Sequence, residues 1–416
     1  MDKSFEHKGI WHLPSQDRKD GVAGILKFQP NKGLTLELIG TFKNQDECEI
    51  LWGIIESDKA VTLYNSFITK KNNILSQLET VIYTCNVALI GGWFNDKNDL
   101  KFNKASVSYS HLDDWLNISS GFKIKHDKIK TQIEYELPEF QKFPITTDFN
   151  LTINPTAKGP ALRLVQKDMS IIQKIYLNFE TSRKTHFDKY LSKIFHFQNF
   201  LTLVTQQSIF VKELSLFFKV ADNKELHETK VFFQLTHIPE LKEELMPFDM
   251  LLPYKDLREN FETIIQKWYS LETKLETSLH QYTSIFYAPF SYVTDRFLNL
   301  CRAMEAYHRD FINNGTVHFI KRCEEVVRNN SNVHNSTLKI PSIPIFAKNV
   351  KNFRNDFTHS NPLTAKNKKY LKTHKLSEYL KLIMACTFLI ETGIDRTVLK
   401  KNIKNSRLYT HLRYKL

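Results

Sequence analysis

The chain has 416 residues, of which 42% are hydrophobic and 25% are charged, with only 12 Gly and 13 Pro. At about 150 residues per domain this length predicts two or three domains, and the composition excludes fibrous and low-complexity proteins. The net charge of +13 comes from residues 301–416, whose 22 basic and 8 acidic residues give +14, since the 36 basic and 37 acidic residues of 1–300 give −1. Such a basic region is typical of proteins that bind nucleic acids or anionic surfaces, although a solvated Lys-rich face gives the same excess.

The first 250 residues are rich in predicted strands. Residues 21–28 and 34–42 alternate or run apolar between turn residues, which is typical of β-strands. A single helix is predicted at residues 186–203, where apolar side chains recur at helical spacing. We expect a β-rich sandwich or barrel over residues 1–130 and a second β-rich region with one helix over residues 131–250. Further strand candidates are residues 60–64, 81–89, 105–110, 149–153, 161–166, 209–217 and 230–235.

After about residue 252 the pattern changes to long amphipathic helices. Asp256 is a predicted N-cap, and apolar residues follow it at helical spacing as far as Leu279. A second helix is predicted to begin at Pro289 and to end at the Asn-Asn-Gly of residues 313–315. The fold class is therefore α+β, with an all-α bundle of five or six helices over residues 251–416. The other predicted helices are residues 317–328, 345–358, 376–392 and 396–412.

Neither the apolar segments nor the cysteines indicate a membrane or secreted protein. The longest apolar segment near the C-terminus, residues 382–390, has about half of the roughly 20 residues that span a bilayer. The first eight residues lack the apolar stretch of a secretory signal, so we expect a cytoplasmic protein. The cysteines are odd in number and far apart, which fits neither a disulfide framework nor a C-x-x-C metal site. We expect buried free thiols at Cys48, Cys85, Cys301, Cys323 and Cys386.

One short motif in the helical region carries chemistry. Arg354 is followed by His359 after four intervening residues. Arg354 lies on an apolar-periodic helix that Pro362 ends at or before residue 361, so the His359 ring at the helix end can turn back toward Arg354. The helix dipole there favours a protonated imidazole. The alternative is a helix-capping His beside a solvated Arg, and the spacing alone does not exclude it.

Two other Arg–His pairs have similar spacing but less favourable contexts. Arg302 and His308 fall within one predicted helix, where six residues separate the two side chains by about 120°. Arg328 and His334 flank the polar residues 329–332, which we interpret as a loop without a rigid element to hold a catalytic geometry. Arg354 and His359 are therefore the candidate site.

This candidate site resembles the HEPN ribonucleases. Their mark is an Arg, a polar residue, and a His after four to six intervening positions, which Arg354, Asn355 and His359 match. Residues 303–308 and residues 248–254, followed by Trp268, are similar to the ApeA-like HEPN branch. Residues 9–14, 24–28, 33–40 and 112–115 are similar to the ApeA N-terminal domain.

The resemblance covers most of the chain and is weakest over residues 130–245. It implies that the all-α bundle is a HEPN domain and that the protein is a bacterial anti-phage toxin. Such a toxin cleaves RNA and halts the growth of the infected cell, an outcome called abortive infection.

Metal-independent RNA cleavage fits the residue types at this site. Attack by a ribose 2′-OH needs a base, an acid and a cation for the developing charge, and His and Arg supply these without a metal or another cofactor. One His359 cannot act on both the attacking and the leaving oxygen, so we expect a two-fold homodimer with facing motifs. The products would be a 2′,3′-cyclic phosphate and a 5′-OH, and DNA would not be cleaved.

The remaining candidate residues have supporting roles. Asn355 is expected to orient the site through hydrogen bonds. Glu305, a carboxylate on a largely apolar helix face, is a lesser catalytic candidate whose expected partner is Arg354. The expected RNA-binding residues are Lys351, Lys366, Lys368, Lys369 and Lys372.

The β-rich half offers no catalytic constellation, and its charge is close to neutral. We therefore expect it to act as a sensor of a phage-derived trigger. Its tryptophans, which include Trp11, Trp52, Trp93 and Trp115, either pack in the core or line a ligand surface.

Two other functions compete with the nuclease. A non-catalytic HEPN module could bind RNA or a nucleotide through Arg354 and the lysines, and phosphate binding would not need His359. A metal-dependent nuclease is disfavoured because the 8 acidic residues of the basic region are dispersed. A structured RNA such as tRNA is a reasonable substrate for the leading hypothesis.

Overall fold

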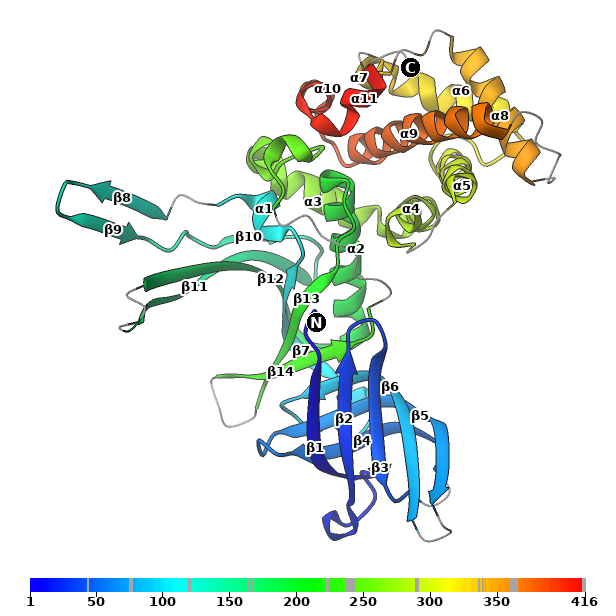
Figure 1. Cartoon of the computed structure of the whole chain (residues 1–416). Coiled ribbons are helices and arrows are strands. Elements are labelled where there is room, and N and C mark those ends of the chain that lie inside the picture. Colours follow the sequence, from blue (N-terminus) through cyan, green and yellow to red (C-terminus); the bar gives the residue numbers. More distant parts are fainter. Residues whose placement is uncertain are drawn as a thin grey trace. The chain divides into compact units, whose positions relative to one another are not determined.

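The computed structural model divides the chain into two compact units (Figure 1). The first comprises Met1–Ser110, Ser120–Phe195 and Phe210–Ile238, and the second comprises His111–Ser119, His196–Ile209 and Pro239–Leu416. The structure describes residues 1–42, 45–74, 78–118, 121–163, 165, 168–220, 225–235, 244–288, 292–335, 337–338, 340, 342–358 and 366–413.

Six antiparallel strands at the start of the first unit close into a barrel (Figure 1). Their order is β6-β3-β2-β1-β4-β5, and β5 pairs back onto β6 along most of its length. Closure removes the free edges that an open sheet would expose. This finding confirms the barrel-like N-terminal half. The strands are β1 (Phe5–His12), β2 (Val22–Gln29), β3 (Gly33–Ile39), β4 (Glu47–Ile55), β5 (Ala60–Ile74) and β6 (Leu78–Ile90).

The barrel interior is filled by large side chains, among them Trp11, which packs closely against Gly53. Trp11 is fully buried, and a Cβ atom on Gly53 would lie 2.4 Å from its six-membered ring. Only glycine leaves room for the indole at this position of β4. Trp11 is therefore a core residue, whereas the half-buried Trp52 and Trp93 stack on each other with ring centroids 6.0 Å apart.

A curved six-stranded antiparallel sheet continues from the barrel through pairing of β14 with the end of β6. Its order is β10-β11-β12-β7-β13-β14. One face is apolar and includes the buried Val107, Phe179 and Leu216, so the other face is free to be polar. The elements are β7 (Lys101–Tyr109), β10 (Gln141–Pro144), β11 (Phe149–Arg163), β12 (Asp168–His186), the helix α2 (Phe187–Thr205), β13 (Val211–Lys219) and β14 (Leu226–Phe233).

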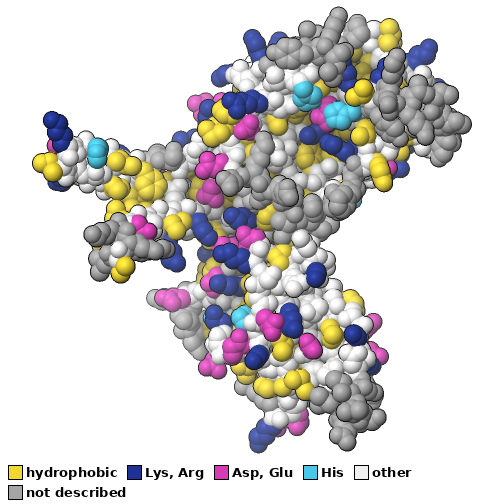
Figure 2. Space-filling view, in the orientation of Figure 1, with side chains coloured by type: hydrophobic (Ala, Val, Ile, Leu, Met, Phe, Trp, Pro, Cys, Tyr) yellow, Lys and Arg dark blue, Asp and Glu magenta, His cyan; other side chains and the backbone are white. Residues whose placement is uncertain are grey.

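Helix α2 begins directly after β12, as the helical spacing predicted. Its N-terminal half belongs to the first unit, where Tyr190 donates a hydrogen bond to the Phe102 carbonyl at 3.0 Å and the Ile194 carbonyl accepts one from Tyr109 at 2.8 Å. A separate hairpin of β8 (Phe122–His126) and β9 (Thr131–Tyr135) projects from this unit. Its exposed side chains include hydrophobic ones, seen at its tip in Figure 2.

The second unit is helical, as predicted for the C-terminal part of the chain. Helix α5 packs against α4, α6, α8 and α9, and its buried residues include Phe297, Cys301 and Met304. None of the helices in the described residues is both long and apolar enough to cross a membrane. The helices are α1 (Leu112–Leu116), α3 (Phe261–Ser270), α4 (Glu272–Tyr287), α5 (Val293–Phe311), α6 (Phe319–Asn329), α7 (Ser331–His334), α8 (Ile343–Thr358), α9 (Lys366–Glu391), α10 (Arg396–Asn405) and α11 (Thr410–Arg413).

The helix starting at Asp256 was predicted wrongly. Asp256 ends a 3₁₀ turn, a second 3₁₀ turn follows, and α3 begins only at Phe261. The apolar stripe misled the prediction because Leu257, its first member, is buried although it lies between two 3₁₀ turns. The stripe is also interrupted at Leu271, where α3 ends before α4 begins. The predicted start of the next helix at Pro289 lies outside the described residues.

Candidate active site

Arg354 lies on α8, which packs against α5 through aromatic rings. The Phe297 ring of α5 contacts the rings of Phe353 and Phe357 at centroid distances of 6.5 and 5.9 Å, both edge-to-face. Edge-to-face contacts restrict the relative placement of the two rings. Because Arg354 directly follows Phe353 on a helix, this packing fixes the backbone from which the guanidinium extends.

The guanidinium of Arg354 forms an ion pair with Glu305 of α5. Its Nη2 lies 3.2 Å from Oε2 of Glu305, while Oε1 accepts a hydrogen bond from Arg309 at 2.9 Å. The side chains of Arg354 and Glu305 are 31% and 20% exposed, so the pair is only partly shielded from water. One carboxylate thus orients two arginines, and part of the Arg354 guanidinium stays accessible to a ligand.

A third helix completes the placement of Arg354. Its Cζ lies 4.6 Å from the ring centroid of Phe319, the first residue of α6. A guanidinium over an aromatic face gains cation–π attraction. Sequence reasoning missed Phe319, because an aromatic residue that opens one helix and an Arg on another leave no periodic signal.

The connection between α5 and α6 is held by a buried hydrogen-bond network. Arg322, only 3% exposed, donates to Nδ1 of His308 at 2.8 Å and to the carbonyls of Asn313 and Gly315 at 3.0 and 2.8 Å. Since Nδ1 of His308 accepts, its Nε2–H donates to the carboxylate of Glu325 at 2.6 Å. The network fixes the loop that leads into α6 and hence the start of that helix.

Two buried thiols lie on the helices that carry Glu305 and Arg322. Cys301 is one helical turn before Glu305 on α5, and burial raises its pKa well above the usual value. Burial likewise raises the pKa of Cys323 to about 12. Both thiols are therefore neutral and apolar at physiological pH. All five cysteines are free and buried, as predicted.

The other predicted residues differ in how far the structure places them. Lys351 and Asn355 are one turn apart on α8 and, with Arg354 between them, lie on neighbouring parts of its surface. Both are half-buried, and the Asn355 side chain makes no hydrogen bond to the described residues. Lys372 is exposed on α9. Outside the described residues lie His359 and the side chains of Lys366, Lys368 and Lys369.

The two competing Arg–His pairs do not form sites. Arg302 is exposed and donates to Asn299 at 3.1 Å, whereas His308 is fully buried, which confirms their predicted separation. The loop predicted before His334 is wrong, because Ser331–His334 form the helical turn α7. His334 is fully buried there, and its Nε2 donates to the Val327 carbonyl at 3.2 Å.

The described part of the site can bind an anion. A partly exposed guanidinium, fixed by a carboxylate and an aromatic ring, can donate two hydrogen bonds to phosphate oxygens. Lys351 adds a second positive charge one turn away on the same helix. This arrangement can stabilise negative charge on a phosphoryl group.

Two family models match the chain. The model of ApeA N-terminal domain 1 matches residues 6–268, and the model of Apea-like HEPN matches residues 298–398. The second match contains Glu305, Phe319 and Arg354. Both agree with the resemblance seen in the sequence, which is thereby confirmed. No curated protein and no solved structure matches the chain.

Proposed function

The chain belongs to the ApeA-like family of HEPN proteins, and from that premise we propose that it is an anti-phage endoribonuclease. The observation that carries the proposal is the Arg354 guanidinium, held by Glu305 at 3.2 Å and yet 31% exposed. A fixed, accessible cation is what a developing phosphorane charge requires.

Arg354 would bind the scissile phosphate, and His359 would transfer the protons. His titrates near neutral pH, so it can act as base toward the 2′-OH or as acid toward the leaving 5′ oxygen. Two facing copies of the site in a homodimer would separate these two roles between protomers. Asn355 would orient the substrate by hydrogen bonding. The products would carry a 2′,3′-cyclic phosphate and a 5′-OH.

Lysines around the site would bind the RNA backbone. Lys351 and the exposed Lys372 are described, and Lys366, Lys368 and Lys369 precede the latter on α9. Contacts of this kind give affinity without sequence specificity. The β-rich regions over residues 1–130 and 131–250 would sense the phage-derived trigger and control the HEPN region over residues 251–416.

A second candidate is a non-catalytic module that binds RNA or a nucleotide. It is favoured by the composition of the described site, which contains cations and a paired carboxylate but no free general base. Phosphate binding needs only the cations. The two candidates differ in whether His359 is required for anything beyond binding.

The test is RNA cleavage by purified protein in EDTA, with tRNA and total cellular RNA as substrates. We expect cleavage by the wild type and its loss, by at least about 100-fold, in His359→Ala and Arg354→Ala. The matched controls are His280→Ala and Arg302→Ala, which remove exposed residues of the same types. If the wild type is silent, the assay is repeated in extracts of phage-infected cells, which supply the trigger.

Cleavage that survives in His359→Ala would reject the assigned site. Loss of RNA binding in Arg354→Ala together with no cleavage by any form, even in infected extract, would favour the binding module instead. Equal folding and equal oligomeric state of all variants are checked first by circular dichroism and by size-exclusion chromatography with light scattering.

A further inference from the structure

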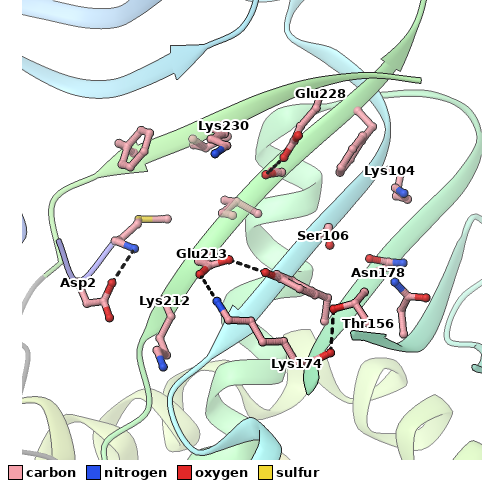
Figure 3. Close-up of a pocket in the computed structure, with 18 of the residues that line it drawn as sticks. Asp2, Lys104, Ser106, Thr156, Lys174, Asn178, Lys212, Glu213, Glu228 and Lys230 are labelled. Carbon is pink, nitrogen blue, oxygen red and sulfur yellow. Dashed lines mark hydrogen bonds and ion pairs between the residues drawn. The ribbon is translucent and has the colours of Figure 1, made fainter. Parts of the chain in front are cut away.

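The polar face of the curved sheet in the first unit contains a second candidate site. A cavity of about 710 Å³ lies over β11, β12, β7, β13 and β14. This volume falls within the range of about 300–1,000 Å³ of small-molecule sites. Figure 3 shows its lining side chains rising from neighbouring strands around one space.

Five lysines line this cavity, Lys3 near the N-terminus and one from each of four adjacent strands. Lys174 is on β12, Lys104 on β7, Lys212 on β13 and Lys230 on β14. Adjacent strands are about 4.8 Å apart, so three such steps separate the outer strands by roughly 14 Å. The positive charges are therefore spread over a length that suits a ligand with several negative groups.

Most of these cations are not neutralised. Glu213 is engaged by Lys174 at 3.0 Å and by the Tyr176 hydroxyl at 2.6 Å. Desolvation acts to raise the pKa of Glu213, but these two hydrogen bonds outweigh it, so its pKa is lowered and the carboxylate is charged. In the part of the chain that the structure describes, no carboxylate lies within 4.0 Å of the ammonium groups of Lys104, Lys212 or Lys230.

Polar side chains continue between the lysines in a straight row. Asn178 of β12, Ser106 of β7, Ser215 of β13 and Lys230 of β14 are successive cross-strand partners. Asn178 is only 5% exposed, and its Oδ1 has no hydrogen-bond partner. A buried acceptor without a partner beside a cavity is a place where a ligand N–H or O–H gains a hydrogen bond.

Aromatic surface accompanies the cations. The Lys104 ammonium lies 4.1 Å from the centroid of the Phe217 ring, and the Tyr176 ring lines the same cavity. Flat rings next to cations suit a ligand that has both a planar base and phosphates.

We propose that this cavity binds a nucleotide with two or more phosphates. The lysines bind the phosphates by charge-assisted hydrogen bonds, Phe217 or Tyr176 contacts the base, and Asn178 accepts a hydrogen bond from it. The five lysines outnumber the carboxylates of Asp2, Glu213 and Glu228 in the cavity lining. A merely solvated sheet face would need neither this excess of cations nor the unpartnered buried amide. That the bound nucleotide regulates the HEPN region rests on the function proposed above, whereas binding itself does not.

The test is isothermal titration calorimetry of the full chain, in EDTA, with the four ribonucleoside triphosphates as probes. At least one is expected to bind, and Lys104→Ala and Lys230→Ala are each expected to weaken it about tenfold. The control is Lys71→Ala, which removes a barrel lysine that is 49% exposed and pairs with Asp46 at 2.6 Å. Unchanged thermal midpoints without nucleotide show that all three variants are folded.

Any one of four results would overturn the proposal. None of the four triphosphates binds at 1 mM, or their affinity is the same in both cavity variants, or inorganic tripolyphosphate binds as tightly as the best nucleotide. The fourth result is that a single-stranded 12-nucleotide RNA competes with the nucleotide and binds the cavity more tightly than the nucleotide does. The cavity would then be a nucleic-acid groove. Since calorimetry needs no RNA cleavage, failure here is distinct from failure of the nuclease.

Discussion

The guanidinium of Arg354 is held by side chains from two other helices, with Glu305 of α5 3.2 Å away and the Phe319 ring centroid of α6 4.6 Å away. The two contacts constrain its position and its tilt, respectively. They do so without removing it from the surface, because the side chain is 31% exposed. In the proposed nuclease this placement would contribute to the cleavage rate, because geometry errors of about 1 Å are costly.

Glu305→Gln is predicted to impair the placement of Arg354 without weakening RNA binding. The variant removes the carboxylate charge that orients Arg354, so we expect RNA cleavage to fall about tenfold while RNA affinity stays equal or rises. Since the pair is partly exposed, the free energy of unfolding should change by less than about 1 kcal/mol. Single-turnover cleavage, RNA titration and urea unfolding measure the three quantities.

The control for this variant is Glu276→Gln, which removes an exposed carboxylate of α4. A Glu305→Gln protein that cleaves RNA faster than the wild type would contradict the orienting role, because the ion pair would then be restraining Arg354.

The spacing of apolar residues predicted individual helices well. The 3.6-residue period of apolar side chains predicted α2, and the apolar period through Phe353 and Phe357 predicted α8. Arg354 could therefore be placed on a helix, and Glu305 could be predicted as its ion-pair partner. The sequence did not distinguish a sandwich from a closed barrel, because the β5–β6 pairing that closes the barrel depends on strand length and twist rather than on a local pattern.

Contacts between distant, non-periodic residues also stayed hidden. Phe319 and Arg322 follow a loop, and their partners Arg354 and His308 lie on other helices. At Asp256 a sequence signal was present but misleading. The apolar stripe begins between two 3₁₀ turns, because residues there are buried without being α-helical. A hydrophobic stripe reports burial, and it reports helix only where the backbone can also close its hydrogen bonds.

The salt dependence of RNA binding is predicted to report phosphate contacts by Lys351 and Lys372. Each contact releases condensed counterions, so replacing either lysine by Ala should reduce the slope of log K against log salt by about 0.7–0.9. Titration of labelled tRNA at NaCl concentrations from about 50 to 300 mM measures the slope. Lys71→Ala, on the barrel, should leave it unchanged, and a variant slope equal to that of the wild type would exclude that lysine from the interface.

Arg322 is predicted to be essential for stability rather than for chemistry. Arg322→Lys leaves several buried acceptors without the donors of a planar guanidinium, among them Nδ1 of His308 and the Gly315 carbonyl. We expect a loss of about 3 kcal/mol in the free energy of unfolding, measured by urea denaturation. Arg328→Lys, an exposed change on the same helix, is the control. A loss below about 0.5 kcal/mol in Arg322→Lys would show that the network does not hold the loop.

His334 is predicted to make the helical unit less stable in acid. Burial lowers the pKa of His334 to about 4 from an ordinary value of 6.5. Above pH 6.5 the ring is neutral in both states, so its contribution to stability is fully present there. Between pH 6.5 and 4 the unfolded chain takes up a proton that the folded chain does not, and stability falls by about 3 kcal/mol in total.

The measurement is urea unfolding followed by circular dichroism from pH 7 to pH 4.5, for the wild type and for His334→Gln. Carboxylates titrate in both proteins, so the difference between the two curves isolates the histidine. The wild type should lose stability more steeply than His334→Gln as the pH falls, whereas His411→Gln, which removes a half-exposed ring, should follow the wild type. Parallel curves for the wild type and His334→Gln would mean that the folded state accepts the proton at His334 as readily as the unfolded chain does.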